Sequence, residues 1–100
     1  MSSGVSGAGA EPTAKTHFVN VHDNFSAYNI GHTHRHVPEI EQELNAASAQ
    51  AVRVTFSPHL LPVAVGILTT IYVNVDPAMT PEKVVALWRE VYQGEPFINI

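Results

Sequence analysis

The chain has 100 residues, 45% of them hydrophobic and 14% charged, which is enough for one domain and too apolar for intrinsic disorder. Five basic residues against nine acidic ones give a formal net charge of −4 without any basic run, so we expect no nucleic-acid partner. Cysteine is absent, which excludes disulfides, thiolate metal sites and a cysteine nucleophile from this chain.

Two sequence features bear on location. The longest apolar stretch, residues 60–73, contains Pro62 and Gly66 and is shorter than the roughly 20 residues that a membrane-spanning helix needs, so we expect no membrane contact. We expect no signal peptide, because residues 1–4 show no positive region followed by an apolar core. These features predict a cytoplasmic protein.

The first half of the chain contains one predicted strand and one predicted helix. Residues 1–16 are rich in Gly, Ser and Ala, which predicts a flexible N-terminal segment that does not start the fold. Residues 17–21 are β-branched or aromatic at three of five positions, which favours a short strand. Residues 38–49 are predicted to form a helix with Pro38 in its first turn and apolar side chains at i, i+4 and i+7.

The second half contains three predicted strands and a second helix. Residues 52–56 alternate between apolar and polar, as in a strand with one buried face, and residues 66–75 form a longer, β-branched strand. A helix is expected to start with Thr80 as N-cap and Pro81 at the first helical position. Residues 97–100 are expected to begin a last strand.

This order of elements predicts the α+β class. We expect a split β-α-β-like arrangement, with a mixed sheet and helices packed on one face, in a single domain over residues 17–100. The sequence shows no internal repeat.

The densest group of chemically active side chains is residues 32–39, where three histidines, an arginine and a glutamate surround the start of the first long helix. Imidazoles at alternate positions suit zinc or copper, but no cysteine or second carboxylate pair accompanies them, so we predict no metal. Alternatively, the helix N-terminus and Arg35 hold an anion while a histidine moves a proton. A third interpretation is that these are surface side chains capping a helix. Spacing alone favours the third.

Two other segments are candidate sites. Residues 56–62 form a loop stiffened by two prolines and carry His59, which either faces a ligand or hydrogen-bonds the backbone. Glycines at positions 4, 7 and 9 lack the preceding strand and following helix of a dinucleotide fingerprint. We therefore expect this chain to bind no cofactor.

Four stretches, in order, resemble successive motifs of the N-acetyl-γ-glutamyl-phosphate reductase family, which is related to the semialdehyde dehydrogenases. They are S-G-V-S-G-A-G at 3–9, H-R-H-V-P-E-I-E-Q at 34–42, F-S-P-H-L-L-P at 56–62 and G-I-L-T-T at 66–70. The resemblance spans nearly the whole chain. It implies a piece of the family's second domain, the substrate-binding and catalytic part, with a fold like the C-terminal domain of glyceraldehyde-3-phosphate dehydrogenase.

The resemblance also implies a chemistry. The family reduces N-acetyl-γ-glutamyl phosphate to N-acetylglutamate semialdehyde with NADPH in arginine biosynthesis, by way of a cysteine in its nucleotide-binding domain. A histidine of the second domain acts as acid–base, and here it corresponds to His36, with His34 as the alternative. The resemblance implies a homo-oligomer and substrate-binding roles for Arg35, Glu39, Ser6 and His59.

This sequence departs from the family pattern in two respects. Ala10 stands where the family has a basic residue, which predicts the loss of an anion contact. The nucleotide-binding domain, its cysteine and the segment expected after Ile100 are not in this sequence, so we expect the isolated chain to be inactive. A stand-alone, non-catalytic binding or dimerisation module of the same fold is the alternative.

Overall fold

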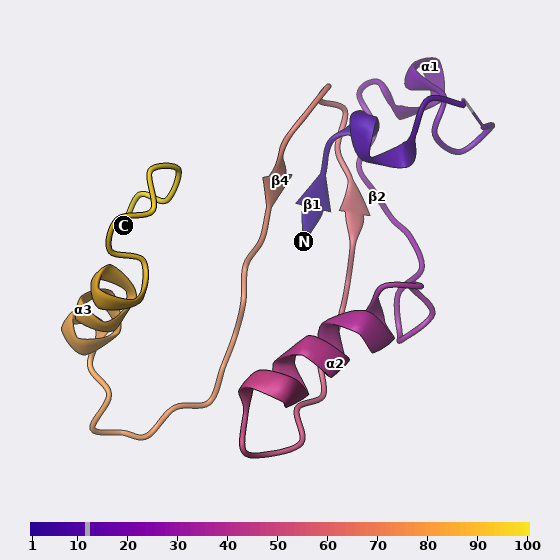
Figure 1. Ribbon diagram of the computed structural model, residues 1–100. Helices are drawn as coiled ribbons and strands as arrows, with labels where there is room; N and C mark the ends of the chain where they lie inside the picture. Colours follow the sequence, from indigo (N-terminus) through magenta and orange to yellow (C-terminus); the bar gives the residue numbers. More distant parts are fainter. Residues whose placement is uncertain (12) are drawn as a thin grey trace. The chain divides into compact units, whose positions relative to one another are not determined.

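The computed structural model describes residues 1–11 and 13–100, which divide into two compact units, Met1–Thr70 and Ile71–Ile100. The first unit contains a four-stranded sheet whose strands are each two residues long, in the order β2-β3-β1-β4 (Figure 1). The strands are β1 (Ser2–Ser3), β2 (Ser26–Ala27), β3 (His59–Leu60) and β4 (Ile67–Leu68).

The sheet is mixed. Strand β1 runs parallel to β3, with Ser2 opposite His59, and antiparallel to β4, with Ser2 opposite Leu68; β2 is antiparallel to β3. Two parallel strands require a crossover, and helix α2 (Val37–Ala47) lies within the one between β1 and β3. The α+β class with a mixed sheet, predicted from the sequence, is therefore confirmed.

The N-terminal residues take part in this sheet. They form β1 and a 3-10 helix, η1 (Val5–Ala8), so the prediction that residues 1–16 do not start the fold is wrong. The backbone N–H of Gly4 donates to Gly66 O (2.9 Å) and that of Val5 to Val63 O (2.9 Å). Hydrogen bonds to residues about sixty positions away order this segment. The local amino-acid composition cannot reveal such distant partners.

The predicted strand at residues 17–21 is also wrong, because the chain forms a short helix, α1 (Phe18–Val21). The His17 side chain caps it by accepting a hydrogen bond from Val19 N at Nδ1 (3.4 Å). Asn20 Nδ2 donates to Ala14 O (2.9 Å). These local side-chain contacts with the backbone outweigh the strand preference of a β-branched segment.

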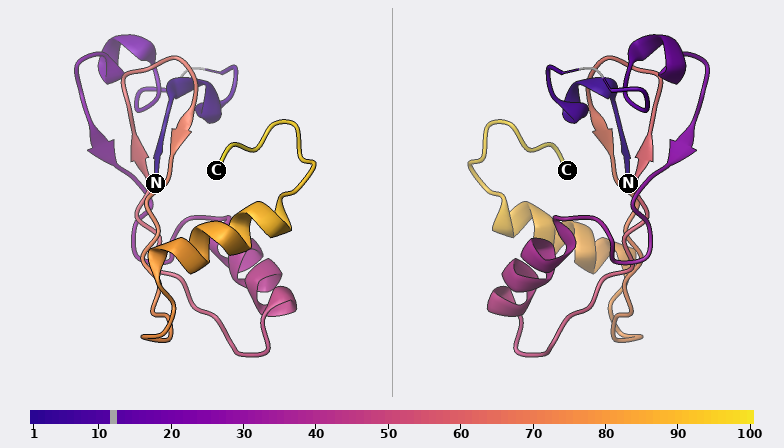
Figure 2. Two further views of the ribbon diagram at one scale, coloured as in Figure 1. Left: turned by 90° about the vertical axis from the view of Figure 1, so that its left-hand side faces the viewer. Right: turned by 90° about the vertical axis from the view of Figure 1, so that its right-hand side faces the viewer.

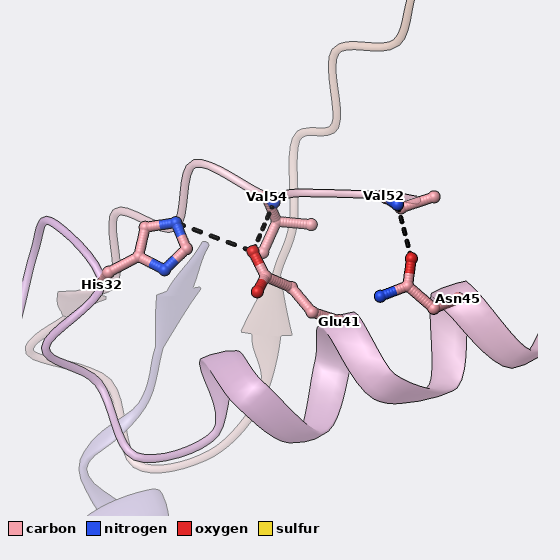
Figure 3. Close-up of polar contacts among 5 residues, drawn as sticks. All are labelled: His32, Glu41, Asn45, Val52 and Val54. Carbon is pink, nitrogen blue, oxygen red and sulfur yellow. Dashed lines mark hydrogen bonds and ion pairs between the residues drawn. The ribbon is translucent and has the colours of Figure 1, made fainter. Parts of the chain in front are cut away.

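Residues 52–56 form no strand, although their burial alternates as predicted, with the three apolar side chains half-buried and the two polar ones exposed. Two side chains of α2 accept the hydrogen bonds that a neighbouring strand would accept. Val54 N donates to Glu41 Oε1 (3.0 Å), and Val52 N donates to Asn45 Oδ1 (Figure 3). The strand prediction for this segment is therefore wrong.

Helices α1 and α2 lie near opposite ends of the short strands (Figures 1 and 2). The buried apolar side chains of the first unit are few: Val21, Val37 and Leu60, with Pro58 also fully buried. Val37 opens α2 and is only 1% exposed, so the start of this helix is anchored in the core. The residues that precede it are thereby held at a defined place.

In the second unit, helix α3 (Pro81–Val91) begins as predicted. The Thr80 side chain accepts a hydrogen bond from Lys83 N (3.4 Å) and Pro81 occupies the first turn. The strand predicted at residues 66–75 forms only at Ile67–Leu68, which is β4 of the first unit. Residues 97–100 form no strand, so that prediction is wrong. The extent of a single domain over residues 17–100 stays a prediction.

Candidate functional site

The candidate site lies where the chain enters helix α2. The loop before it places Asn29, Gly31 and His32 at positive φ, between 45° and 68°, and this turns the chain sharply after β2. His36 is the N-cap of α2, although its side chain makes no capping hydrogen bond. Three consecutive side chains, at residues 34–36, thus project from a bend that is fixed on one side by the buried Val37.

His34 and His36 form a close pair. Their ring centroids are 5.1 Å apart, with an interplanar angle of 71°. Arg35 Nε donates to His36 Nε2 (3.1 Å), and His36 N donates to His34 Nδ1 (3.3 Å). An arginine Nε–H can only donate, so His36 Nε2 is the unprotonated nitrogen of a neutral ring in this arrangement. By the same reasoning, neutral His34 carries its proton on Nε2.

Aromatic rings surround His34. Phe56 lies 5.1 Å away and Tyr28 5.6 Å away, measured between ring centroids. Burial, followed by the neighbouring His36 and Arg35, lowers the pKa of His34 below its ordinary value. His34 is therefore neutral at pH 7, when its Nε2–H can donate to an oxygen of a ligand.

Residues 34–36 line a cavity of about 910 Å³ in the first unit. Its other titratable side chains are Lys15 and Tyr28, and among the described residues no carboxylate lines it. Thr13 and Thr16 add hydroxyl groups to the lining. In a chain of net charge −4, Lys15 and Arg35 in a lining without a described carboxylate make the cavity suited to an anion.

The structure brings together three of the six predicted site residues, namely His34, Arg35 and His36. The other three do not line this cavity. Glu39 is exposed in the first turn of α2, and Ser6 uses its backbone N–H to bond Ala64 O (3.0 Å). His59 stacks on Phe25, with ring centroids 4.8 Å apart, and its Nδ1 lies 3.1 Å from Ser57 O. This contact corresponds to the backbone-bonded interpretation of His59.

Sequence reasoning missed Lys15 and Glu41. Lys15 is the only lysine before position 83, and it sits between two threonines whose side chains are hydrogen-bonded to each other (2.7 Å). The sequence feature that marks this position is a single lysine close to two threonines. The role of Glu41 depends on a contact with Val54, thirteen residues away, which no local pattern reveals.

Among residues 1–11 and 13–100, no three His, Cys, Asp or Glu side chains are grouped so that they could hold a metal ion. Within the same residues, no helix is both long enough and apolar enough to cross a membrane.

Comparison with known proteins decides the family. The family model described as "Semialdehyde dehydrogenase, dimerisation domain" matches residues 1–100. The chain belongs to this family. It is also similar to proteins named N-acetyl-gamma-glutamyl-phosphate reductase: 50% identical over 98 residues to that of Symbiobacterium thermophilum, 49% to that of Desulforamulus reducens and 44% to that of Geobacter metallireducens.

The family membership confirms the resemblance seen in the sequence motifs. Each of the three matches covers 98% of this chain but 28% of the relative, so the chain spans about a quarter of the length of these reductases. The family model that matches is described as a dimerisation domain. The residues that line the cavity, including His34 and His36, lie within the matched range.

Proposed function

We propose that this chain is the part of an N-acetyl-γ-glutamyl-phosphate reductase that binds the anionic groups of the substrate and moves protons during reduction to the semialdehyde. The observation that carries the proposal is the His34–His36 pair, tied together through Arg35 in a cavity whose titratable lining is cationic or neutral. The names of the similar reductases supply the substrate.

Arg35 has two competing partners in this proposal. In the structure its Nε–H is donated to His36 Nε2. A phosphate or carboxylate attracts a guanidinium more strongly than a neutral imidazole does, because it carries the opposite charge and its oxygens can accept two parallel N–H hydrogen bonds from the planar guanidinium. Substrate binding therefore turns Arg35 away and leaves the Nε2 lone pair of His36 free to accept a proton.

His34 has a complementary role. Its neutral Nε2–H donates a hydrogen bond to oxygen as negative charge develops there, while His36 accepts and returns the proton. This keeps His36 as the first candidate for the acid–base residue and His34 as its neighbour. Lys15 and Arg35 offset the charge of the anion. Glu39, Ser6 and His59 stay predicted substrate contacts of the complete enzyme.

We expect NADPH to bind in a part of the reductase outside this chain. The glycines at positions 4, 7 and 9 lie around β1 and the four-residue 3-10 helix η1, which is not the strand, glycine loop and α-helix of a dinucleotide-binding fingerprint. We therefore place the hydride donor, and the cysteine nucleophile that this chain lacks, in other parts of the reductase. The chain alone is expected to show no turnover, and the reductase is expected to work in the cytoplasm.

We also propose that the chain associates with a second copy of itself. Large apolar side chains remain exposed in both units, among them Ile67 (69%) and Trp88 (50%). Exposed apolar side chains are stabilised when a partner covers them. The family description as a dimerisation domain supports the same assignment.

A domain exchange tests the proposed function. The matching residues of the Symbiobacterium thermophilum reductase are replaced by this chain, and oxidation of NADPH is followed with N-acetyl-γ-glutamyl phosphate as substrate. The proposal predicts turnover that depends on the acyl phosphate. A chimera that folds and associates as its parent does, but shows no turnover, would contradict it.

A further inference from the structure

Glu41 touches both chain segments that flank His34 in space. Its Oε1 atom accepts the hydrogen bond from Val54 N (3.0 Å) and lies 3.7 Å from His32 Nε2 (Figure 3). The side chain is only 18% exposed, although it is charged and on a helix surface. A carboxylate held so close to two distant segments is placed to fix one against the other.

The first segment is the left-handed loop before the histidine pair. His32 has φ of 65°, a conformation that few non-glycine residues adopt and that costs on the order of 1 kcal/mol or more. The contact of its ring with Glu41 helps to hold this backbone. His34 follows two residues later, so the backbone conformation at His32 helps to set the position of the pair.

The second segment is residues 52–56. Glu41 and Asn45, one helical turn apart on α2, accept the backbone N–H groups of Val54 and Val52 respectively. These contacts replace a strand neighbour and fix the segment in an extended form. It ends at Phe56, whose ring lies against the imidazole of His34.

We propose that Glu41 is a positioning residue for His34, holding the loop before it and the aromatic wall beside it in one arrangement. The importance of this arrangement for turnover rests on the proposed function. The contacts of Glu41 themselves are independent of that proposal. Four groups face His34: Tyr28 from the loop after β2, Arg35 and His36 from the bend, and Phe56 from the extended segment.

Loss of Glu41 is expected to change how His34 titrates. Burial is the largest of the causes that hold the pKa of His34 low. When Phe56 and the loop are released, water reaches the imidazole and stabilises its charged form. The titration midpoint of His34 then rises toward the ordinary value of 6.5.

The test is a histidine titration of the 100-residue chain by NMR, which requires neither substrate nor turnover and so cannot fail together with the proposed function. Glu41→Ala removes both contacts, whereas Glu41→Gln keeps an oxygen that accepts from Val54 N. Glu43→Ala is the matched control, because Glu43 is exposed on the same helix. We expect the midpoint of His34 to rise in Glu41→Ala, to change less in Glu41→Gln and to stay in Glu43→Ala.

An unchanged midpoint in a folded Glu41→Ala chain overturns the proposal, as does an equal rise in the Glu43→Ala control. If Glu41→Ala does not fold, His32→Asn carries the test, because asparagine tolerates the left-handed backbone and only the imidazole contact is lost. A smaller rise of the His34 midpoint is then expected, and no rise overturns the proposal. In the domain exchange chimera, Glu41→Ala should lower kcat and shift its acid limb to higher pH, with KM little changed.

Discussion

Arg35 Nε donates a hydrogen bond to His36 Nε2 at 3.1 Å, so the residue proposed to bind the anion and the residue proposed to move the proton share one contact. Any ligand that attracts the guanidinium also changes the hydrogen bonding of the imidazole. In the proposed function, binding of an anion and availability of the base are therefore coupled.

Inorganic phosphate should reveal this coupling in the 100-residue chain. The ring resonances of His36 are expected to shift on titration with phosphate as Arg35 turns toward the anion, and Arg35→Ala should abolish that response. The measurement is an NMR titration at constant pH and ionic strength. A His36 response that persists unchanged in Arg35→Ala would mean that the two residues are not coupled.

Lys15→Ala should weaken phosphate binding by about two- to fivefold, since an exposed charge pair contributes roughly 0.5–1 kcal/mol. Lys15 lines the cavity, whereas Arg53 is an exposed cation that does not. Arg53→Ala is therefore the matched control and should bind phosphate as the unaltered chain does. Equal weakening in both variants would indicate a general charge effect in place of a contact in the cavity.

The stability of the first unit should fall on acidification because of His34. Its pKa in the folded chain is below the unfolded value of about 6.5, so near pH 6 the unfolded state binds more protons than the folded one. Stability is therefore retained above pH 6.5 and decreases as pH falls below it. Urea unfolding at pH 7.5 and pH 5.5 measures the change, which should be smaller in His34→Gln. An identical pH dependence in that variant would assign the effect to other groups.

Gly4→Ala should destabilise the first unit by about 1–3 kcal/mol, because overpacking against rigid atoms forces the backbone to move. A Cβ at Gly4 would lie 2.8 Å from Val63 O and 3.0 Å from Val65 Cα, which are backbone atoms. Gly7 offers the control, since a Cβ there meets nothing within 4 Å. Urea midpoints of the two variants are compared, and equal midpoints would rule out close packing of Gly4 against residues 63–65.

Thr80→Ala should shorten or fray α3, with a loss of about 1 kcal/mol in helix stability, because Lys83 N loses its acceptor. The same side chain is the main cause of the lowered pKa of Glu82, so that pKa should rise in the variant. Backbone and carboxylate NMR shifts report both effects. Thr70→Ala, at an exposed position outside the helix, should change neither.

The two long helices could be predicted from the sequence because their signals are local. Pro38 within the first turn of α2, and Thr80 with Pro81 at the start of α3, act within a few residues of the backbone they organise. The family motifs likewise identified residues 34–36, three neighbours that the structure places in one cavity. Local chemistry was sufficient for the two helices, whereas residues 34–36 were singled out by the resemblance to a family and their role stays a prediction.

The sheet and the support of the site could not be predicted, because they depend on distant partners. Strand β1 is ordered by hydrogen bonds to β3 and β4, and its own Ser-rich sequence has little strand preference. The N–H groups of residues 52 and 54 are taken by side chains of α2, which an alternating pattern does not reveal. The contacts of Glu41 with Val54 and His32 therefore could not be predicted from the sequence.

The most direct test of the central claim is kcat in the chimeric reductase carrying His36→Ala, His34→Ala or His22→Ala. His22 pairs with Asp23 outside the cavity lining and is the control. Acid–base catalysis contributes about 10²- to 10⁴-fold, so His36→Ala and His34→Ala should each lose most of kcat while His22→Ala retains it. Near-normal turnover in both of the first two variants would contradict the assignment of proton transfer to this histidine pair.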